Sequence, residues 1–159
     1  MPAREWAWKL TLIALAYLTL YFTFGYFIAF QNPSVLAYYN EPEPSSFGAH
    51  IQTLLRDRPW LFGLQVLRAM MWVAIALPVI RMMKGNWPET ALALALLFGV
   101  VMTTLLLIPN PYMPESVRLT HMVETASSNF LFGCLVGWLL TPRHGGVRLS
   151  SGARPARAA

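Results

Sequence analysis

The feature that most constrains this chain is a series of four apolar segments, which cover residues 6–30, 59–83, 88–108 and 115–140. A helix needs about 20 mostly apolar residues to cross the hydrocarbon core of a bilayer, and each segment reaches that length. In a chain of 159 residues, little remains for a soluble domain. The segments therefore predict an all-α membrane protein, with four transmembrane helices in an up-and-down bundle that forms one domain over residues 1–141.

The composition agrees with the membrane class, because 56% of the residues are hydrophobic and only 12% are charged. The formal net charge of +5 is also a property of nucleic-acid-binding proteins. Here, however, the basic residues cluster just beyond the ends of the apolar segments, where membrane topology accounts for them. We therefore expect no nucleic-acid partner. The single cysteine, Cys134, lies within an apolar segment and predicts neither a disulfide framework nor a cysteine-based metal site.

The basic residues also predict the orientation of the helices. In a four-span arrangement, eight of the twelve Lys and Arg residues fall on one side of the membrane and three on the other. The positive-inside rule places the side with eight, and with it both termini, in the cytoplasm. Trp and Tyr residues near the predicted helix ends match the aromatic belts of membrane interfaces. This pattern predicts a multi-pass protein of the plasma or inner membrane.

The predicted helix ends follow from local signals. Proline opens the second, third and fourth helices, where its missing N–H costs nothing, and Gln31-Asn32-Pro33 ends the first. In the first outer loop, Phe47 begins a run of apolar residues at helical spacing, which predicts a short amphipathic helix at the membrane interface. Residues 142–159 lack apolar periodicity and are rich in Gly, Ser, Arg and Ala, which predicts a disordered basic cytoplasmic tail.

Two charged residues lie inside apolar segments, Arg68 in the second and Glu124 in the fourth. Such charges are rare, because placing Arg or Asp near mid-bilayer costs about 2.5–3.5 kcal/mol on insertion scales. Counted from the outer helix ends at about 1.5 Å per residue, both lie roughly 12–14 Å deep. Their shared depth predicts an intramembrane ion pair in the outer half of the bundle.

Further polar residues share the faces of these two charges. Glu124 shares a helix face with His121, Thr125 and Ser128, because the four residues have the spacing i, i+3, i+4 and i+7. Gln65 precedes Arg68 by three residues and shares its face. A second pattern, Gly133 and Gly137, is a GxxxG spacing that predicts close helix packing, within the monomer rather than in a dimer. The predicted ligand-binding or buried polar site comprises Arg68, Glu124, His121, Gln65, Thr125, Ser128, Asn129 and Tyr26.

Two interpretations of this polar site stay open. Its residues can simply hold helices together, since interhelical hydrogen bonds in membranes contribute about 0.6 kcal/mol each on average. Packing alone, however, is served by small residues without a full charge pair. We therefore expect a site that binds or transports a small anionic or lipid-like ligand, with Arg68 holding the anionic group. The alternative is a non-catalytic accessory or assembly subunit of a larger membrane complex.

Catalysis and metal binding have weaker support. His121 or Glu124 could act as a general acid or base, but no nucleophile motif accompanies them. The same two residues supply only two possible metal ligands, both on one helix. A di-iron carboxylate site needs several matching motifs, and a b-type haem usually needs two axial ligands. We therefore expect no catalytic residue, no metal and no cofactor. Membrane lipids are the expected partners, and both a homo-oligomer and a larger membrane complex stay open.

Overall fold

The computed structural model describes residues 2–83 and 86–142, and within these ranges the chain is helical without strands. Four helices are long and apolar enough to cross a membrane: Ala3–Ala29, Trp60–Met82, Trp87–Leu107 and Glu115–Leu140. They correspond to the four apolar segments of the sequence. The prediction made for the basic tail falls on residues 143–159, which lie outside the described residues.

The first long helix changes its geometry before it ends. α1 (Ala3–Phe24) continues into a π-helical turn, η1 (Gly25–Ala29), and a second helix then begins directly, α2 (Pro33–Tyr39). The side chain of Asn32 caps α2 by accepting a hydrogen bond from the backbone N–H of Ser34 at 2.9 Å. The sequence prediction ended the first helix correctly at this point but did not include α2. An Asn cap followed by proline at the first helical position is the signal that could have found it.

The amphipathic helix predicted in the first outer loop is present as α3 (Phe47–Asp57). Ser46 caps it, since its hydroxyl oxygen accepts a hydrogen bond from the N–H of Ala49 at 3.2 Å. His50 and Leu54 form its buried face, one turn apart. These two side chains bring α3 into contact with the rest of the molecule.

The remaining helices are α4 (Trp60–Met82), α5 (Trp87–Gly99), η2 (Val101–Leu107) and α6 (Glu115–Leu140). The third apolar segment was predicted as one helix but changes from α5 to the tighter 3₁₀ form in η2. At this junction the Thr103 hydroxyl donates to the carbonyl oxygen of Gly99 at 2.6 Å. Such side-chain bonds to the preceding turn compete with regular helical pairing.

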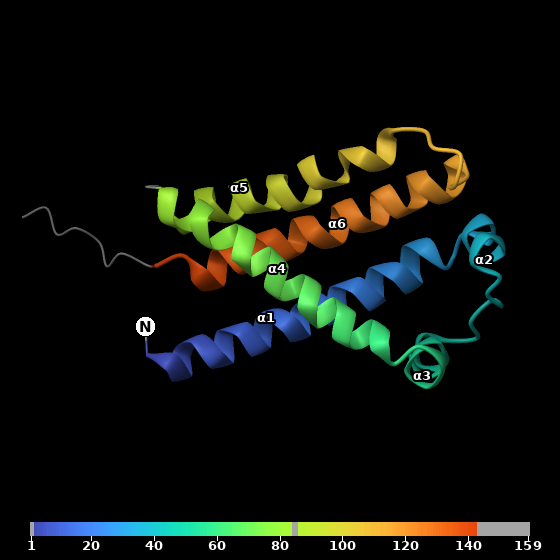
Figure 1. Ribbon diagram of the computed structural model, residues 1–159, viewed down its shortest axis with the longest axis horizontal. Helices are drawn as coiled ribbons and strands as arrows, with labels where there is room; N and C mark the ends of the chain where they lie inside the picture. Colours follow the sequence, from blue (N-terminus) through green and yellow to red (C-terminus); the bar gives the residue numbers. More distant parts are fainter. Residues whose placement is uncertain (1, 84–85, 143–159) are drawn as a thin grey trace, which may run out of the picture.

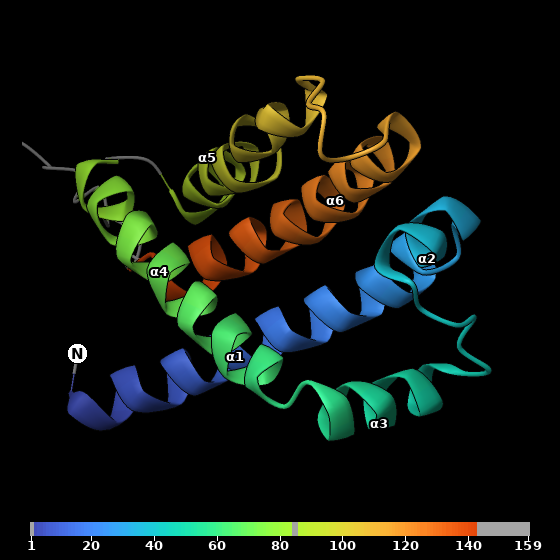
Figure 2. The same cartoon turned by 45° about the vertical axis from the view of Figure 1, so that its right-hand side comes forward.

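The four long helices run in alternating directions, so that the start of α1 and the end of α6 lie at one end of the molecule (Figure 1). α5 and α6 lie side by side over most of their length, and α4 crosses the other helices obliquely (Figures 1 and 2). The short helices α2 and α3 lie at the opposite end, which we call the α2–α3 end. The oblique course of α4 leaves this end less tightly packed.

Close packing of α5 against α6 depends on small residues. A Cβ atom added to Gly133 would lie 2.6 Å from the backbone of Ala95, and one added to Gly137 would lie still closer to the Cα atom of Ala91. The GxxxG face of α6 is therefore occupied by α5 of the same chain. Tyr17, Trp72, Phe98 and other apolar residues of all four long helices complete a core nearer the chain termini. The dense core and the α2–α3 end thus form two different regions.

Candidate functional site

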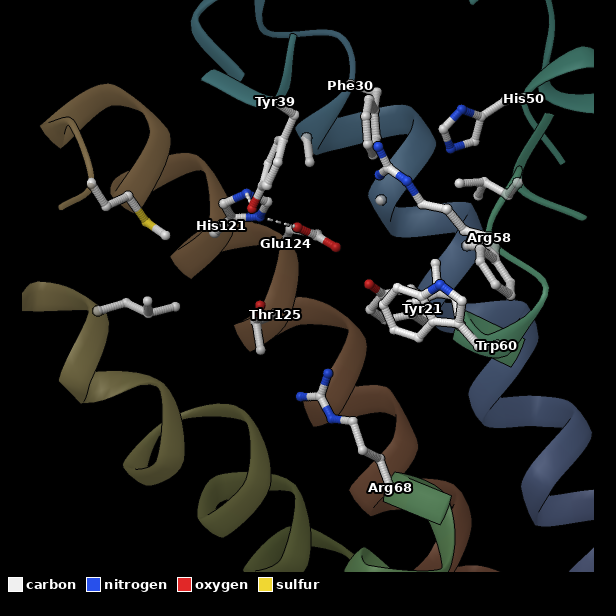
Figure 3. A pocket seen from close by; sticks show the side chains of 17 residues that line it. Tyr21, Phe30, Tyr39, His50, Arg58, Trp60, Arg68, His121, Glu124 and Thr125 are labelled. Atoms are coloured by element: carbon white, nitrogen blue, oxygen red, sulfur yellow. Dashed lines mark hydrogen bonds and ion pairs between the residues drawn. The ribbon is translucent and has the colours of Figure 1, made fainter. Parts of the chain in front are cut away.

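A cavity of about 430 Å³ occupies the α2–α3 end (Figure 3). Its walls come from α1 and η1, from the short helices α2 and α3, and from α4, η2 and α6. Most of the wall is apolar or aromatic, with Phe22, Phe30, Trp60, Leu61, Leu106 and Met113 among its residues. The polar groups that line it are Tyr21, Tyr39, His50, Arg58, Arg68, His121, Glu124 and Thr125.

The carboxylate of Glu124 is bound by a neighbour on its own helix. His121 Nδ1 lies 2.7 Å from Glu124 Oε2, and His121 Nε2 lies 3.1 Å from the hydroxyl of Tyr39 on α2. A carboxylate can only accept a hydrogen bond, so Nδ1 carries the hydrogen. In a neutral imidazole Nε2 then accepts the hydrogen bond that Tyr39 donates. The three residues form a hydrogen-bonded chain from the exposed α2 helix to the cavity wall.

The direct ion pair predicted between Arg68 and Glu124 is not formed. Within the described residues, no carboxylate oxygen lies within 4.0 Å of the Arg68 guanidinium. Its Nη1 atom instead donates a long hydrogen bond of 3.5 Å to Gln65, one turn earlier on α4. Both charges nevertheless line the same cavity, and Arg68 points into it toward α6 (Figure 3). His121 is the nearer partner of Glu124 because it lies one turn away on the same helix.

Residues from α3 and from the loop before α4 form the rim of the cavity. Arg58 forms an ion pair with Glu41, so its charge is balanced. Burial lowers the pKa of His50 below its ordinary value, although the nearby Glu41 carboxylate partly opposes this shift. On α2, burial raises the pKa of Tyr39, and the neighbouring Tyr38 and Glu124 act in the same direction. His50 and Tyr39 therefore favour their neutral forms.

A second, smaller cavity of about 40 Å³ shares Tyr21, Arg68, Glu124 and Thr125 with the first. It reaches further toward the core, where Ser128 and Asn129 line it. This volume is enough for a water molecule, which needs roughly 10–15 Å³ of such space and several polar partners. The polar stripe of α6 is thus divided between two adjacent cavities.

The structure brings together only part of the predicted site. Arg68, His121, Glu124 and Thr125 line the large cavity, and Ser128 and Asn129 line the small one. Gln65 is fully buried and reaches the site only through Arg68. Tyr26 lies outside the lining of either cavity and packs its ring against Phe47 and His50, at centroid distances of 5.4 and 5.8 Å.

The sequence prediction missed several residues of the site. Tyr39 and Arg58 had been assigned to the aromatic belt and to the outer basic residues, and His50 to an interfacial helix. The helical spacing of His50 and Leu54 is the sequence signal that could have predicted the wall that α3 contributes to the cavity. Tyr21 belongs to an apolar segment and carried no separate signal.

A buried cation outside the cavity was also missed. Arg118 had been counted as an outer-side basic residue, but only 4% of it is exposed. Its Nη1 atom donates a hydrogen bond of 2.6 Å to the carbonyl oxygen of Leu106, near the end of η2. Arg118 therefore ties the start of α6 to η2, and so to one wall of the cavity.

In the described part of the chain, no three His, Cys, Asp or Glu side chains gather as ligands for a metal ion. No protein family, curated protein or solved structure matches the chain. The functional interpretation therefore depends on the geometry and charges of the cavity.

Proposed function

We propose that this is a multi-pass protein of the plasma or inner membrane, with both termini in the cytoplasm, that binds or transports a small anionic or lipid-like ligand. The ligand occupies the large cavity at the α2–α3 end. The single observation that carries this proposal is Arg68, a cation on α4 that lines the cavity and has no carboxylate of the described residues within 4.0 Å.

An isolated charge at membrane depth is costly, and such charges are usually paired or functional. Among the described residues, Arg68 makes one long hydrogen bond, to the neutral side chain of Gln65. Most of its five N–H donors therefore have no partner within this part of the chain. The planar guanidinium matches the geometry of a carboxylate or phosphate group. A bound anion would therefore supply the partner that the described residues do not.

The remainder of the cavity suits an apolar portion of the same ligand. Its volume of about 430 Å³ lies within the range of about 300–1,000 Å³ typical of ligand sites. Trp60 and Leu61 from α4 and Leu106 from η2 supply apolar wall beyond the charged groups. The combination favours an amphipathic ligand over a fully hydrated small ion.

The alternative of an accessory subunit loses one of its arguments. Such a subunit would bind its partner through the GxxxG face of α6 and through the methionine-rich α4, but Gly133 and Gly137 lie against Ala95 and Ala91 of α5 in this chain. Of these two surfaces, α4 is the one left for a partner complex, with Met71 and Met82 exposed on it. The experiment below separates the two functions.

The test is native mass spectrometry of the full chain, extracted gently from its own membrane. We expect a small molecule or lipid to stay bound to the wild type and to be lost from Arg68→Met. The matched control is Arg56→Met, because Arg56 is exposed on α3 and pairs with Asp57. Retention that is identical in Arg68→Met and wild type, or a larger protein complex in place of a small molecule, would contradict the proposal.

A further inference from the structure

The cavity presents two opposite charges that do not neutralise each other. The guanidinium of Arg68 comes from α4 and the carboxylate of Glu124 from α6, and more than 4.0 Å separates their charged atoms. Arg58, the other cation in the lining, is already paired with Glu41. The charges left for a ligand are therefore one positive and one negative group on facing helices.

Glu124 keeps one acceptor atom for a ligand. Its Oε2 atom accepts the hydrogen bond from His121, whereas Oε1 receives none from the described residues. Beside Oε1 lies Gly25, at the start of the π-helical turn, and a Cβ atom at that position would lie only 3.5 Å from this oxygen. Gly25 also lines the cavity, so Oε1 lies beside a part of the wall that carries no side chain.

A ligand has to complement both charges, and a simple anion, a simple cation or a neutral molecule does not. A plain anion that satisfies Arg68 would place a like charge beside Glu124, and a cation would do the same beside Arg68. A neutral ligand would leave both charges without a counter-ion. A zwitterion satisfies both, provided that its cationic group carries N–H donors for Glu124 Oε1.

We infer that the cavity accepts an aminoethyl phosphate headgroup, with the phosphate on Arg68 and the primary ammonium on Glu124. This inference rests on the proposed function and names its ligand class. A phosphate oxygen pair matches the guanidinium fork, and a primary ammonium has three N–H donors. The apolar wall between α4 and η2 accommodates the start of an acyl chain, so the headgroup is that of a phosphatidylethanolamine-type lipid.

The test uses the full chain in dodecyl maltoside, titrated with lipids of identical acyl chains and monitored by native mass spectrometry. The series consists of phosphatidylethanolamine, its mono- and dimethyl forms, phosphatidylcholine and phosphatidylglycerol. We expect binding to weaken as N–H donors are removed, by about fivefold or more from phosphatidylethanolamine to phosphatidylcholine, the factor that one hydrogen bond contributes. This comparison needs no variant and is independent of any folding defect.

Variants assign the two ends of the headgroup. Glu124→Gln should abolish the preference for phosphatidylethanolamine over phosphatidylcholine, and Arg68→Met should weaken binding of every phospholipid in the series. Arg56→Met should bind as the wild type does. Soluble phosphoethanolamine at the same concentration should not displace the lipid; displacement would overturn the lipid as the source and assign the site to the free zwitterion.

Failure of this inference differs from failure of the proposed function. Phosphatidylglycerol could bind as tightly as phosphatidylethanolamine, or more tightly, in a manner that depends on Arg68. That result would overturn the inference of a zwitterionic ligand but would keep the proposal of an anionic one. Binding of all lipids that is equal in Arg68→Met and wild type would overturn both.

Discussion

At the residue scale, the chemistry of the cavity depends on which partner holds Glu124. The carboxylate lies 2.7 Å from His121 on its own helix and has no contact within 4.0 Å with Arg68. Glu124 and Arg68 therefore line the cavity as separate charges. Their interaction should be weaker than that of Glu124 with His121, because no hydrogen bond or ion pair joins them.

Two double-mutant cycles measure this difference. His121→Phe and Glu124→Gln should be coupled by about 0.5–3 kcal/mol, as expected for residues in direct contact. Arg68→Met and Glu124→Gln should be coupled more weakly than the first pair, because the two residues line the same cavities but no contact joins them. The measurement is the free energy of unfolding of delipidated protein in detergent. Strong coupling in the second cycle would mean that the two charges pair directly after all.

His50 gives a pH dependence that belongs to the same scale. Its pKa is lowered in the folded protein, chiefly by burial, from an ordinary value of 6.5. As pH falls below 6.5, the unfolded chain therefore takes up a proton that the folded protein resists, and stability is lost. Well above pH 6.5, His50 is neutral in both the folded and the unfolded protein, and it then has no effect on how stability changes with pH.

We expect the melting temperature of the wild type to fall more steeply between neutral and mildly acidic pH than that of His50→Gln. Differential scanning fluorimetry in detergent at a series of pH values measures both slopes. The other titrating groups are common to the two proteins, so the difference isolates His50. Parallel curves would contradict the prediction.

At the scale of elements, the contact between α5 and α6 is the most closely packed part of the fold. Gly133→Ala would place its new Cβ atom 2.6 Å from the backbone of Ala95, which cannot rotate away as a side chain can. We expect this substitution to cost about 1–3 kcal/mol of unfolding free energy, as overpacking typically does.

Gly63 provides a matched control on α4, because a Cβ at that position would meet no described atom within 4 Å beyond its chain neighbours and the nearby backbone of its own helix. Alanine favours the helix over glycine by about 0.5–1 kcal/mol, so Gly63→Ala should be neutral or stabilising. Unfolding in detergent compares the two variants directly. Equal effects at the two positions would show that α5 and α6 are not in close contact.

The irregular elements explain why helix boundaries were predicted less well than helices. Apolar composition favours a helix over residues 88–108 but does not distinguish α5 from the 3₁₀ form of η2. The change depends on Thr103, whose hydroxyl bonds two backbone carbonyls, and on Arg118, which binds the carbonyl of Leu106 from another helix. The second of these contacts exists only after η2 and α6 have packed together.

At the scale of the whole molecule, the distribution of basic residues predicts the topology. We expect Ser45→Cys, between α2 and α3, to react with a membrane-impermeant maleimide added to intact cells. Ala3→Cys should react only after the membrane is permeabilised. Both variants carry Cys134→Ala, which removes the native thiol. The reverse pattern would mean that the termini lie outside the cytoplasm.

The sequence alone determined four helices that are long and apolar enough to span a membrane, because length and apolarity are local properties of each segment. It also identified Arg68, His121, Glu124 and Thr125, since polar residues in apolar segments are conspicuous. Tertiary structure decided that Tyr39, His50 and Arg58 join them, that Tyr26 does not, and that Arg68 and Glu124 stay apart. These outcomes depend on how α4 crosses the other helices and where α2 and α3 fold back. That arrangement arises from packing between distant segments, which local periodicity does not encode.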